Sequence, residues 1–208
     1  ARELLRLSFV ANAMANTLNL SGAIGSGVRL LGLSGFGVPM RRSAALVGLQ
    51  VLSLPLGLSA LVIATLASGS LPVTPNSATH WLAIAVLVAA ALYLPLYMVL
   101  TGRRRLMRWL PEEQGLPPWH LKLSLAVLSL ADWLLAAGSL WLCLVLAGAQ
   151  VDATALLAAY TGAAVLGLAS MIPGGFGVFD GLLLLALSAA GGPGEHVTAG
   201  LILFRVVY

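Results

Sequence analysis

The chain has 208 residues, of which 60% are hydrophobic and only 9% are charged, and its formal net charge is +4. Soluble domains carry about 25% charged residues, so this composition excludes a soluble globular protein and indicates an integral membrane protein. The single cysteine, Cys143, excludes a disulfide framework or a cysteine-based zinc site, and we expect no metal or other cofactor.

The first and last residues favour a piece of a longer protein. The chain begins Ala1-Arg2-Glu3, without methionine or a signal-peptide pattern, and it stops at Tyr208 directly after the apolar run 201–204. We therefore expect residues 1–208 to form a single transmembrane domain fragment, an all-α polytopic helical bundle.

Apolar runs of about 20 residues predict helices that cross a bilayer. The first run is weak evidence for a span because polar residues occur throughout it. The half-helix near the end has about 13 residues, or roughly 20 Å, which is too short for a crossing. In chain order the expected segments are spans at 7–28, 43–67, 81–101, 121–147 and 153–172, a half-helix at 178–190 and a span over 196–208 that the end of the chain cuts short.

Arginine and lysine residues in the short loops predict the orientation. Loop 29–42 has three arginines, and loop 102–122 has a four-arginine cluster and a lysine. Loops 68–80 and 148–152 have neither residue type. We therefore expect the first two loops in the cytoplasm and the other two outside.

The first expected span has a polar face formed by Asn12, Asn16 and Asn19. Their spacing of four and three residues places them on one side of a helix. Such a stripe either joins helices through amide hydrogen bonds or lines a substrate path. The glycines at Gly22–Gly27 favour a broken or re-entrant helix there, before Arg29.

Asp132 lies in the middle of an expected span, between Ala131 and Trp133. A carboxylate at that depth must be paired, hydrated or protonated. It is either a structural partner of an arginine or asparagine, or a contact for a cation or amine in a cavity.

The strongest sequence signal is a break between two apolar helical runs, at residues 171–180. Proline ends the preceding hydrogen-bond ladder, and glycines adopt backbone angles that other residues resist. A helix starting near Val178 would direct its free N–H groups and positive dipole end to the break, which suits a phosphate. Asp180, in its first turn, either caps this helix or faces a cavity as a ligand for a positive group. The break itself is formed by Pro173, Gly174, Gly175 and Gly177.

Arg205 lies inside the final apolar run. We expect this cation to pair with Asp180, with Asp132 or with an anionic lipid head group. The sequence shows no nucleophile–base–acid spacing, nucleotide-binding loop or redox motif, so we assign no catalytic residue.

Three stretches together resemble a known family. They are the run from Asn12 through Gly22 and Gly25 to Arg29, the run 170–180, and the closing Phe204-Arg205-Val206-Val207-Tyr208. The combination resembles the membrane domain of the multiple peptide resistance factor, the bacterial phosphatidylglycerol lysyltransferase family.

The resemblance implies two activities in the full-length protein. A cytosolic domain would transfer lysine or alanine from aminoacyl-tRNA to phosphatidylglycerol, and the membrane domain would carry the product to the outer leaflet. Lower negative surface charge then weakens the binding of cationic antimicrobial peptides. Nothing in residues 1–208 resembles the transferase, so this segment would be the translocating half.

The same resemblance implies a multi-pass protein of the bacterial inner membrane. Its partners would be phosphatidylglycerol, the aminoacyl form of this lipid and the cytosolic synthase domain of the same protein. Direct contact of this segment with nucleic acid is not expected, and glycine-rich helices leave room for a homo-oligomer.

A lipid that crosses the bilayer needs contacts for its phosphate and, once aminoacylated, for its amine. Arg29, Arg205 and the N–H groups at Val178 suit the phosphate, while Asp180 and Asp132 suit the amine and the asparagine stripe suits the glycerol and ester. The roles of Asp180 and Arg205 follow from the resemblance, and those of Asp132 and Arg29 from position alone. The alternatives are a secondary transporter of a small charged solute and a passive anchor for a cytosolic lipid-modifying enzyme.

Overall fold

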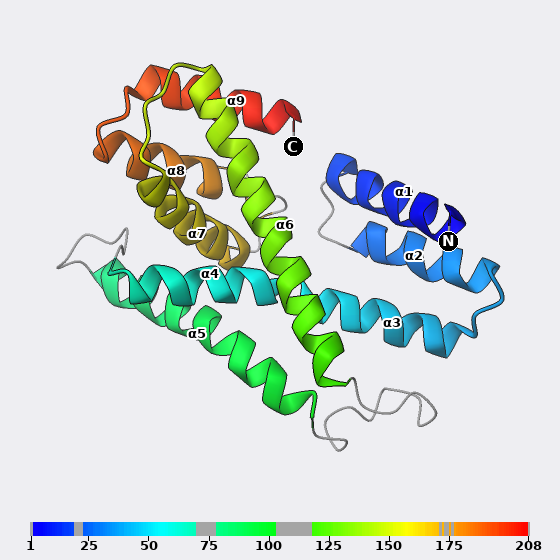
Figure 1. The fold of residues 1–208 in the computed structure, drawn as a ribbon. Helices are drawn as coiled ribbons and strands as arrows, with labels where there is room; N and C mark the ends of the chain where they lie inside the picture. Colours follow the sequence, from blue (N-terminus) through cyan, green and yellow to red (C-terminus); the bar gives the residue numbers. More distant parts are fainter. Residues whose placement is uncertain are drawn as a thin grey trace. The chain divides into compact units, whose positions relative to one another are not determined.

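A computed structural model describes residues 2–18, 23–69, 78–102, 118–170, 172, 175 and 177–207, with the backbone alone for 4, 12–18, 23, 24 and 78–82. All regular structure in these residues is helical, which confirms the expected all-α class (Figure 1). The helices are α1 (Arg2–Leu18), α2 (Ala23–Gly35), α3 (Met40–Ser53), α4 (Pro55–Ala67), α5 (Ala78–Leu100), α6 (Trp119–Leu146), α7 (Ala153–Ala169), α8 (Val178–Ala189) and α9 (Gly194–Val207).

Within the described residues, three helical segments are long and apolar enough to cross a membrane, namely Met40–Ala67, Ala83–Leu100 and Trp119–Leu146. The apolar helices α7 and α8 are shorter, with 17 and 12 residues. The structure is that of a polytopic helical membrane bundle.

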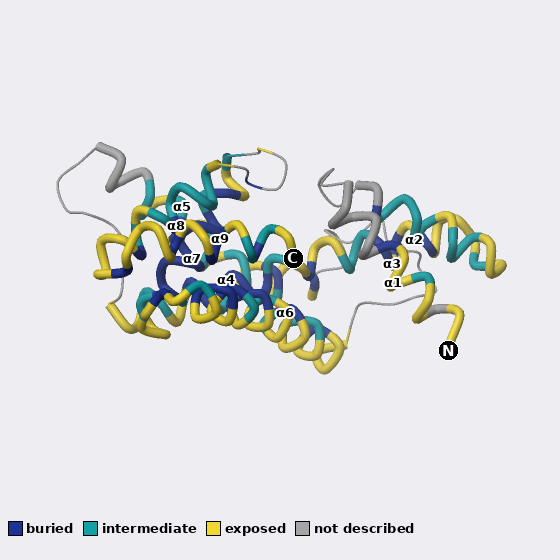
Figure 2. The backbone as a smooth tube through the Cα atoms, turned by 90° about the horizontal axis from the view of Figure 1, so that it is seen from above, coloured by how far each residue is buried: buried dark blue, intermediate teal, exposed yellow. Residues whose placement is uncertain are grey.

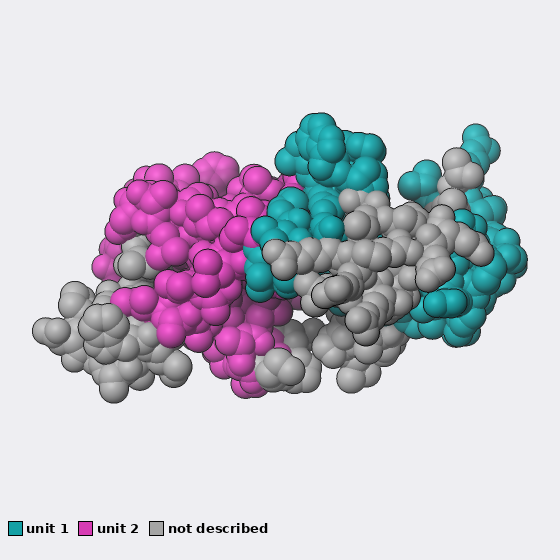
Figure 3. Space-filling model, turned by 90° about the horizontal axis from the view of Figure 1, so that it is seen from below, with its two compact units in different colours: residues 1–54, 96–125 teal, residues 55–95, 126–208 magenta. Residues whose placement is uncertain are grey.

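The chain divides into two compact units (Figure 3). The first unit comprises Ala1–Leu54 and Leu96–Leu125. The second comprises Pro55–Pro95 and Ala126–Tyr208.

In the first unit, α2 packs against both α1 and α3. The segment expected as one span at 7–28 contains two helices, α1 and α2, and residues 19–22 between them lie outside the described residues. Two separate helices on either side of residues 19–22 agree with the expected broken helix, and Gly25 and Gly27 lie inside α2. A further glycine of α2, Gly32, lies close to α1, since a Cβ on it would lie 2.3 Å from Leu7 Cδ1.

The apolar run expected at 43–67 is divided at Pro55, the first residue of α4. Proline has no N–H to donate to the carbonyl four residues earlier. The N–H of Leu54 donates instead to Val51 O, at 3.3 Å. Leu54 keeps right-handed helical angles, with φ −56° and ψ −43°, so no loop separates α3 from α4.

In the second unit, α4 and α6 approach to backbone contact. A Cβ on Gly57 would lie 2.3 Å from the carbonyl carbon of Ser129, so no larger residue fits without moving a helix. The N–H of Gly57, in the first turn of α4, donates to Ser129 Oγ at 2.9 Å. A first-turn N–H has no partner within its own helix, and the α6 hydroxyl supplies one.

The core of the second unit lies between α6, α7, α8 and α9. Figure 2 shows the buried stretches on these helices, next to exposed stretches of the same helices. The exposed leucines and valines on the other faces are typical of helices that contact lipid. Side chains of the core with less than 2% exposure include Leu140, Leu144, Leu183, Leu187 and Val197.

Candidate functional site

The expected break between α7 and α8 begins at Ser170. Helix α7 ends at Ala169, and Ser170 Oγ donates to Gly167 O at 2.6 Å and accepts from the N–H of Ile172 at 3.3 Å. The serine side chain thus forms hydrogen bonds with a backbone carbonyl and a backbone N–H at the end of the helix, where such groups lack helical partners. Pro173 and Gly174, to which the sequence assigned this break, lie outside the described residues.

Two glycines shape the part of the break that leads into α8. Gly175 and Gly177 have φ of 62° and 82°, in the left-handed region that favours glycine. A Cβ on Gly175 would also lie 3.3 Å from Phe179 Cβ and 3.6 Å from Gly167 Cα. The absence of side chains at these positions lets the start of α8 fold back close to the end of α7.

Asp180 and Arg205 form a bidentate ion pair. Arg205 Nε donates to Asp180 Oδ1 and Arg205 Nη2 donates to Asp180 Oδ2, each at 2.9 Å. Asp180 lies in the first turn of α8 and Arg205 in the last turn of α9. At these positions each charge interacts favourably with the dipole of its helix. The Gly177 N–H also donates to Asp180 Oδ2, at 3.4 Å, so the carboxylate has capping and ion-pairing roles.

Both side chains of the pair are 29% exposed. The ion pair is therefore neither fully solvated nor sealed in a dry core. Aromatic rings form its apolar side: the guanidinium carbon of Arg205 lies 5.3 Å from the centroid of the Phe179 ring, at cation–π distance. The Phe179 ring lies 5.8 Å from that of Tyr160 and 6.4 Å from that of Phe204.

Asp180 and Arg205 can both exchange partners at the same time, so that neither charge is left without a counter-charge. A ligand with one anionic and one cationic group could bind Arg205 and Asp180 at the same time. A ligand with a single charge would leave one member of the pair uncompensated, which is costly away from water.

Other expected site residues in the described helices belong to α1, α2 and α6. Arg29 belongs to the first unit, where it is half-buried in α2 and has an interaction partner. Asp132 lies in α6 of the second unit and is exposed, and no ion pair joins it to a cation within the described residues. Asn12 and Asn16 lie in α1 with the backbone alone described, and Asn19 lies outside the described residues.

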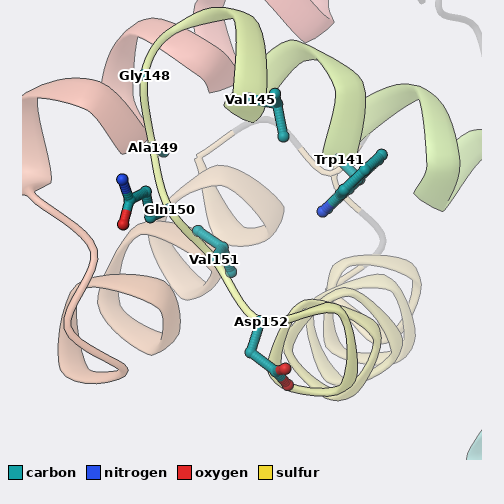
Figure 4. A pocket seen from close by; sticks show the side chains of 7 residues that line it. All are labelled: Trp141, Val145, Gly148, Ala149, Gln150, Val151 and Asp152. Carbon is teal, nitrogen blue, oxygen red and sulfur yellow. The ribbon is translucent and has the colours of Figure 1, made fainter.

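A hollow that sequence reasoning missed lies at the turn from α6 into α7. It has a volume of about 520 Å³ and is lined by Trp141, Val145, Gly148, Ala149, Gln150, Val151 and Asp152 (Figure 4). Asp152 is the N-cap of α7. An aspartate directly before an apolar run is a known signal for a helix start, but the indole wall of the hollow has no such signal because it depends on how the chain turns.

Comparisons with known proteins find a family that matches the whole chain, and relatives of similar sequence. The family described as "Lysylphosphatidylglycerol synthase TM region" matches residues 1–208. A phosphatidylglycerol lysyltransferase of Staphylococcus aureus (strain MRSA252) is 30% identical over 209 residues, which cover 99% of this chain and 24% of the relative. The protein of the same name from Staphylococcus haemolyticus (strain JCSC1435) is 28% identical with the same coverage. The chain thus spans about a quarter of the length of these relatives, and no solved structure matches it.

Proposed function

The chain belongs to the family of lysylphosphatidylglycerol synthase transmembrane regions, and from this premise we propose that it carries aminoacylated phosphatidylglycerol from the inner to the outer leaflet of a bacterial cell membrane. The relatives are named for transferring a lysyl group to phosphatidylglycerol. The product of that transfer has a phosphate and at least one amine. A domain that moves it must accommodate both charges within an apolar bundle.

The ion pair between Asp180 and Arg205 carries the proposal. An arginine fork suits a phosphate, which it can bind through two parallel N–H groups. An aspartate suits an ammonium group. In the proposed mechanism the lipid phosphate takes the place of Asp180 on Arg205 while the lipid amine takes the place of Arg205 on Asp180.

Exchange of both partners also gives selectivity for the aminoacyl form. Unmodified phosphatidylglycerol offers a phosphate but no amine, so binding Arg205 would leave Asp180 without a cation. A charge left without its partner in a partly buried site is destabilising. The pair therefore stays closed against phosphatidylglycerol and opens for its aminoacylated product.

The remaining polar positions extend the proposed path. The free N–H groups at the start of α8, beside Gly175 and Gly177, offer a second contact for the phosphate. Arg29 and Asp132 would meet phosphate and amine elsewhere along the path. The stripe of Asn12, Asn16 and Asn19 would bind the glycerol and ester oxygens.

We propose that the whole protein also has the synthase activity. Its cytosolic synthase domain would lie in the part of the relatives that this chain does not cover. We also propose that the protein self-associates. In the cell, the outcome would be a less negative outer surface that binds cationic antimicrobial peptides more weakly.

The test is to express the chain with a separately supplied synthase and to measure the lysyl lipid on the cell surface. A membrane-impermeant, amine-reactive reagent labels the outer leaflet, and total lipid extraction gives the amount synthesised. We expect Asp180→Asn and Arg205→Ala to lower the labelled share by roughly tenfold, which corresponds to about 1.4 kcal/mol, while total synthesis stays constant.

The matched control is Arg6→Ala, which removes the exposed ion pair that Arg6 forms with Glu3. We expect it to leave labelling unchanged because an exposed pair contributes little. The exchanged variant, Asp180→Arg with Arg205→Asp, retains both charges and should recover part of the labelling. Unchanged labelling in both single variants would instead favour a passive anchor for the synthase.

A further inference from the structure

The hollow at the turn from α6 into α7 combines apolar walls with one fixed charge. Trp141 and Val145 extend from α6, and Val151 and Asp152 extend from the segment that leads into α7 (Figure 4). Its volume of about 520 Å³ is within the usual range for pockets that bind small molecules. The indole of Trp141 is 44% exposed, so part of its face is open to a ligand.

The hydrogen bonds of Asp152 leave half of its carboxylate available. Oδ2 accepts from the N–H groups of Thr154 and Ala155, at 2.9 and 3.1 Å, and from the Thr154 hydroxyl. Among the residues that the structure describes, the hydrogen bonds of this carboxylate all end on Oδ2, so Oδ1 keeps its lone pairs for a further donor. Capping the helix and binding a cation are therefore compatible roles for this one side chain.

Asp152 also carries a negative charge. Hydrogen bonds from the Thr154 hydroxyl and then from the backbone of Ala155 and Thr154 lower the pKa of Asp152 below its usual value, so the carboxylate is ionised at neutral pH. Ion pairs within the described ranges join Arg6 to Glu3 and Arg205 to Asp180, and no cation there pairs with Asp152.

We propose that this hollow binds the ammonium head group of the aminoacylated lipid after it has crossed the bilayer. The ammonium would contact Asp152 Oδ1 and the face of the Trp141 indole, since a carboxylate and an indole both attract cations. Val145 and Val151 would contact the less polar glycerol portion. The inference rests on the proposed function and on the orientation expected from loop 148–152, which has no lysine or arginine and is placed outside.

Binding can be followed separately at the two sites because a tryptophan lies near each. Trp141 lines the hollow, whereas the ring of Trp133 lies 6.2 Å from that of Tyr160, between centroids. The Tyr160 ring in turn packs edge to face with Phe179, beside the ion pair. The chain is labelled with 5-fluorotryptophan and titrated with short-chain lysyl-phosphatidylglycerol in detergent. The chain has five tryptophans, and the variants Trp141→Phe and Trp133→Phe assign the fluorine resonances of these two.

We expect the Trp141 resonance to shift with the lysyl lipid. The midpoint should lie about three- to fivefold higher in Asp152→Asn, the effect of losing an exposed ion pair. Asparagine is also a good N-cap, so α7 keeps its start, and Asp152→Ser provides a second capping variant without charge. Glu195→Gln removes another first-turn carboxylate, one that does not line the hollow, and should leave the midpoint unchanged.

Three results would overturn the inference: no shift of Trp141, an equal midpoint in the capping variants, or equal binding of free lysine and the lysyl lipid. Failure of the proposed function looks different. In that case the Asp152-dependent shift of Trp141 persists while the Asp180 and Arg205 variants leave surface labelling in cells unchanged.

Discussion

Ser59 repairs the hydrogen bonding of α5 where a proline interrupts it. Pro95 lies inside α5 and cannot donate to the carbonyl of Ala91, four residues earlier. Ser59 Oγ, from α4, donates to Ala91 O at 3.0 Å and accepts from the N–H of Leu94, also at 3.0 Å. One buried hydroxyl thus satisfies two backbone groups at the break.

Ser59→Ala is expected to lower the free energy of unfolding by about 1 to 2 kcal/mol, because it leaves a buried carbonyl unpaired. Thermal unfolding of the purified chain in detergent measures the loss. Ser139→Ala is the matched control, since Ser139 Oγ bonds Leu135 O within its own helix. If Ser59 acts through the proline, its substitution should cost little in a Pro95→Ala background, and an equal cost in both backgrounds would contradict this role.

At the scale of helices, Gly57 sets the distance between α4 and α6. A Cβ there would meet the Ser129 backbone at 2.3 Å, so Gly57→Ala must push the helices apart. We expect a loss of about 1 to 3 kcal/mol in stability. Gly138→Ala in α6 is the control, because a Cβ there meets nothing within 4 Å; it should stabilise by about 0.5 to 1 kcal/mol. Equal effects of the two substitutions would show that the close approach is unimportant.

Hydropathy located the helices because apolar runs of sufficient length have few alternatives in a membrane. It did not separate α1 from α2, because a window of 20 residues averages over the end of one helix and the start of the next. It also did not divide α3 from α4, since Pro55 is accommodated there by a single shifted hydrogen bond, from Leu54 to Val51. Helix ends depend on such local bonds more than on composition.

The candidate site was predictable in its residue types but not in its pairing. The sequence offered Asp180, Asp132 and a lipid head group as partners for Arg205, and the structure brings Arg205 to Asp180. That choice depends on the way α9 packs on α8, which no spacing along the chain encodes. The hollow beside Asp152 stayed unrecognised for the same reason.

At the scale of the whole molecule, the family membership and the fold agree on a membrane domain. In the described part of the second unit, the ion pair between Asp180 and Arg205 lies at the break between two short apolar helices. In the proposed mechanism, a lipid with a phosphate and an amine opens this ion pair, and a lipid with a phosphate alone does not. Selectivity between two lipids is therefore the property that separates the account from non-specific lipid scrambling or passive anchoring.

The most direct measurement uses the purified chain in liposomes with an acyl-labelled fluorescent lipid, either lysyl-phosphatidylglycerol or phosphatidylglycerol. An impermeant quencher reports how fast each lipid reaches the outer leaflet. We predict faster movement of the lysyl lipid than of phosphatidylglycerol, and loss of that difference in Asp180→Asn. Equal rates for the two lipids in the unmodified protein, or a difference that survives Asp180→Asn, would contradict the exchange of ion-pair partners.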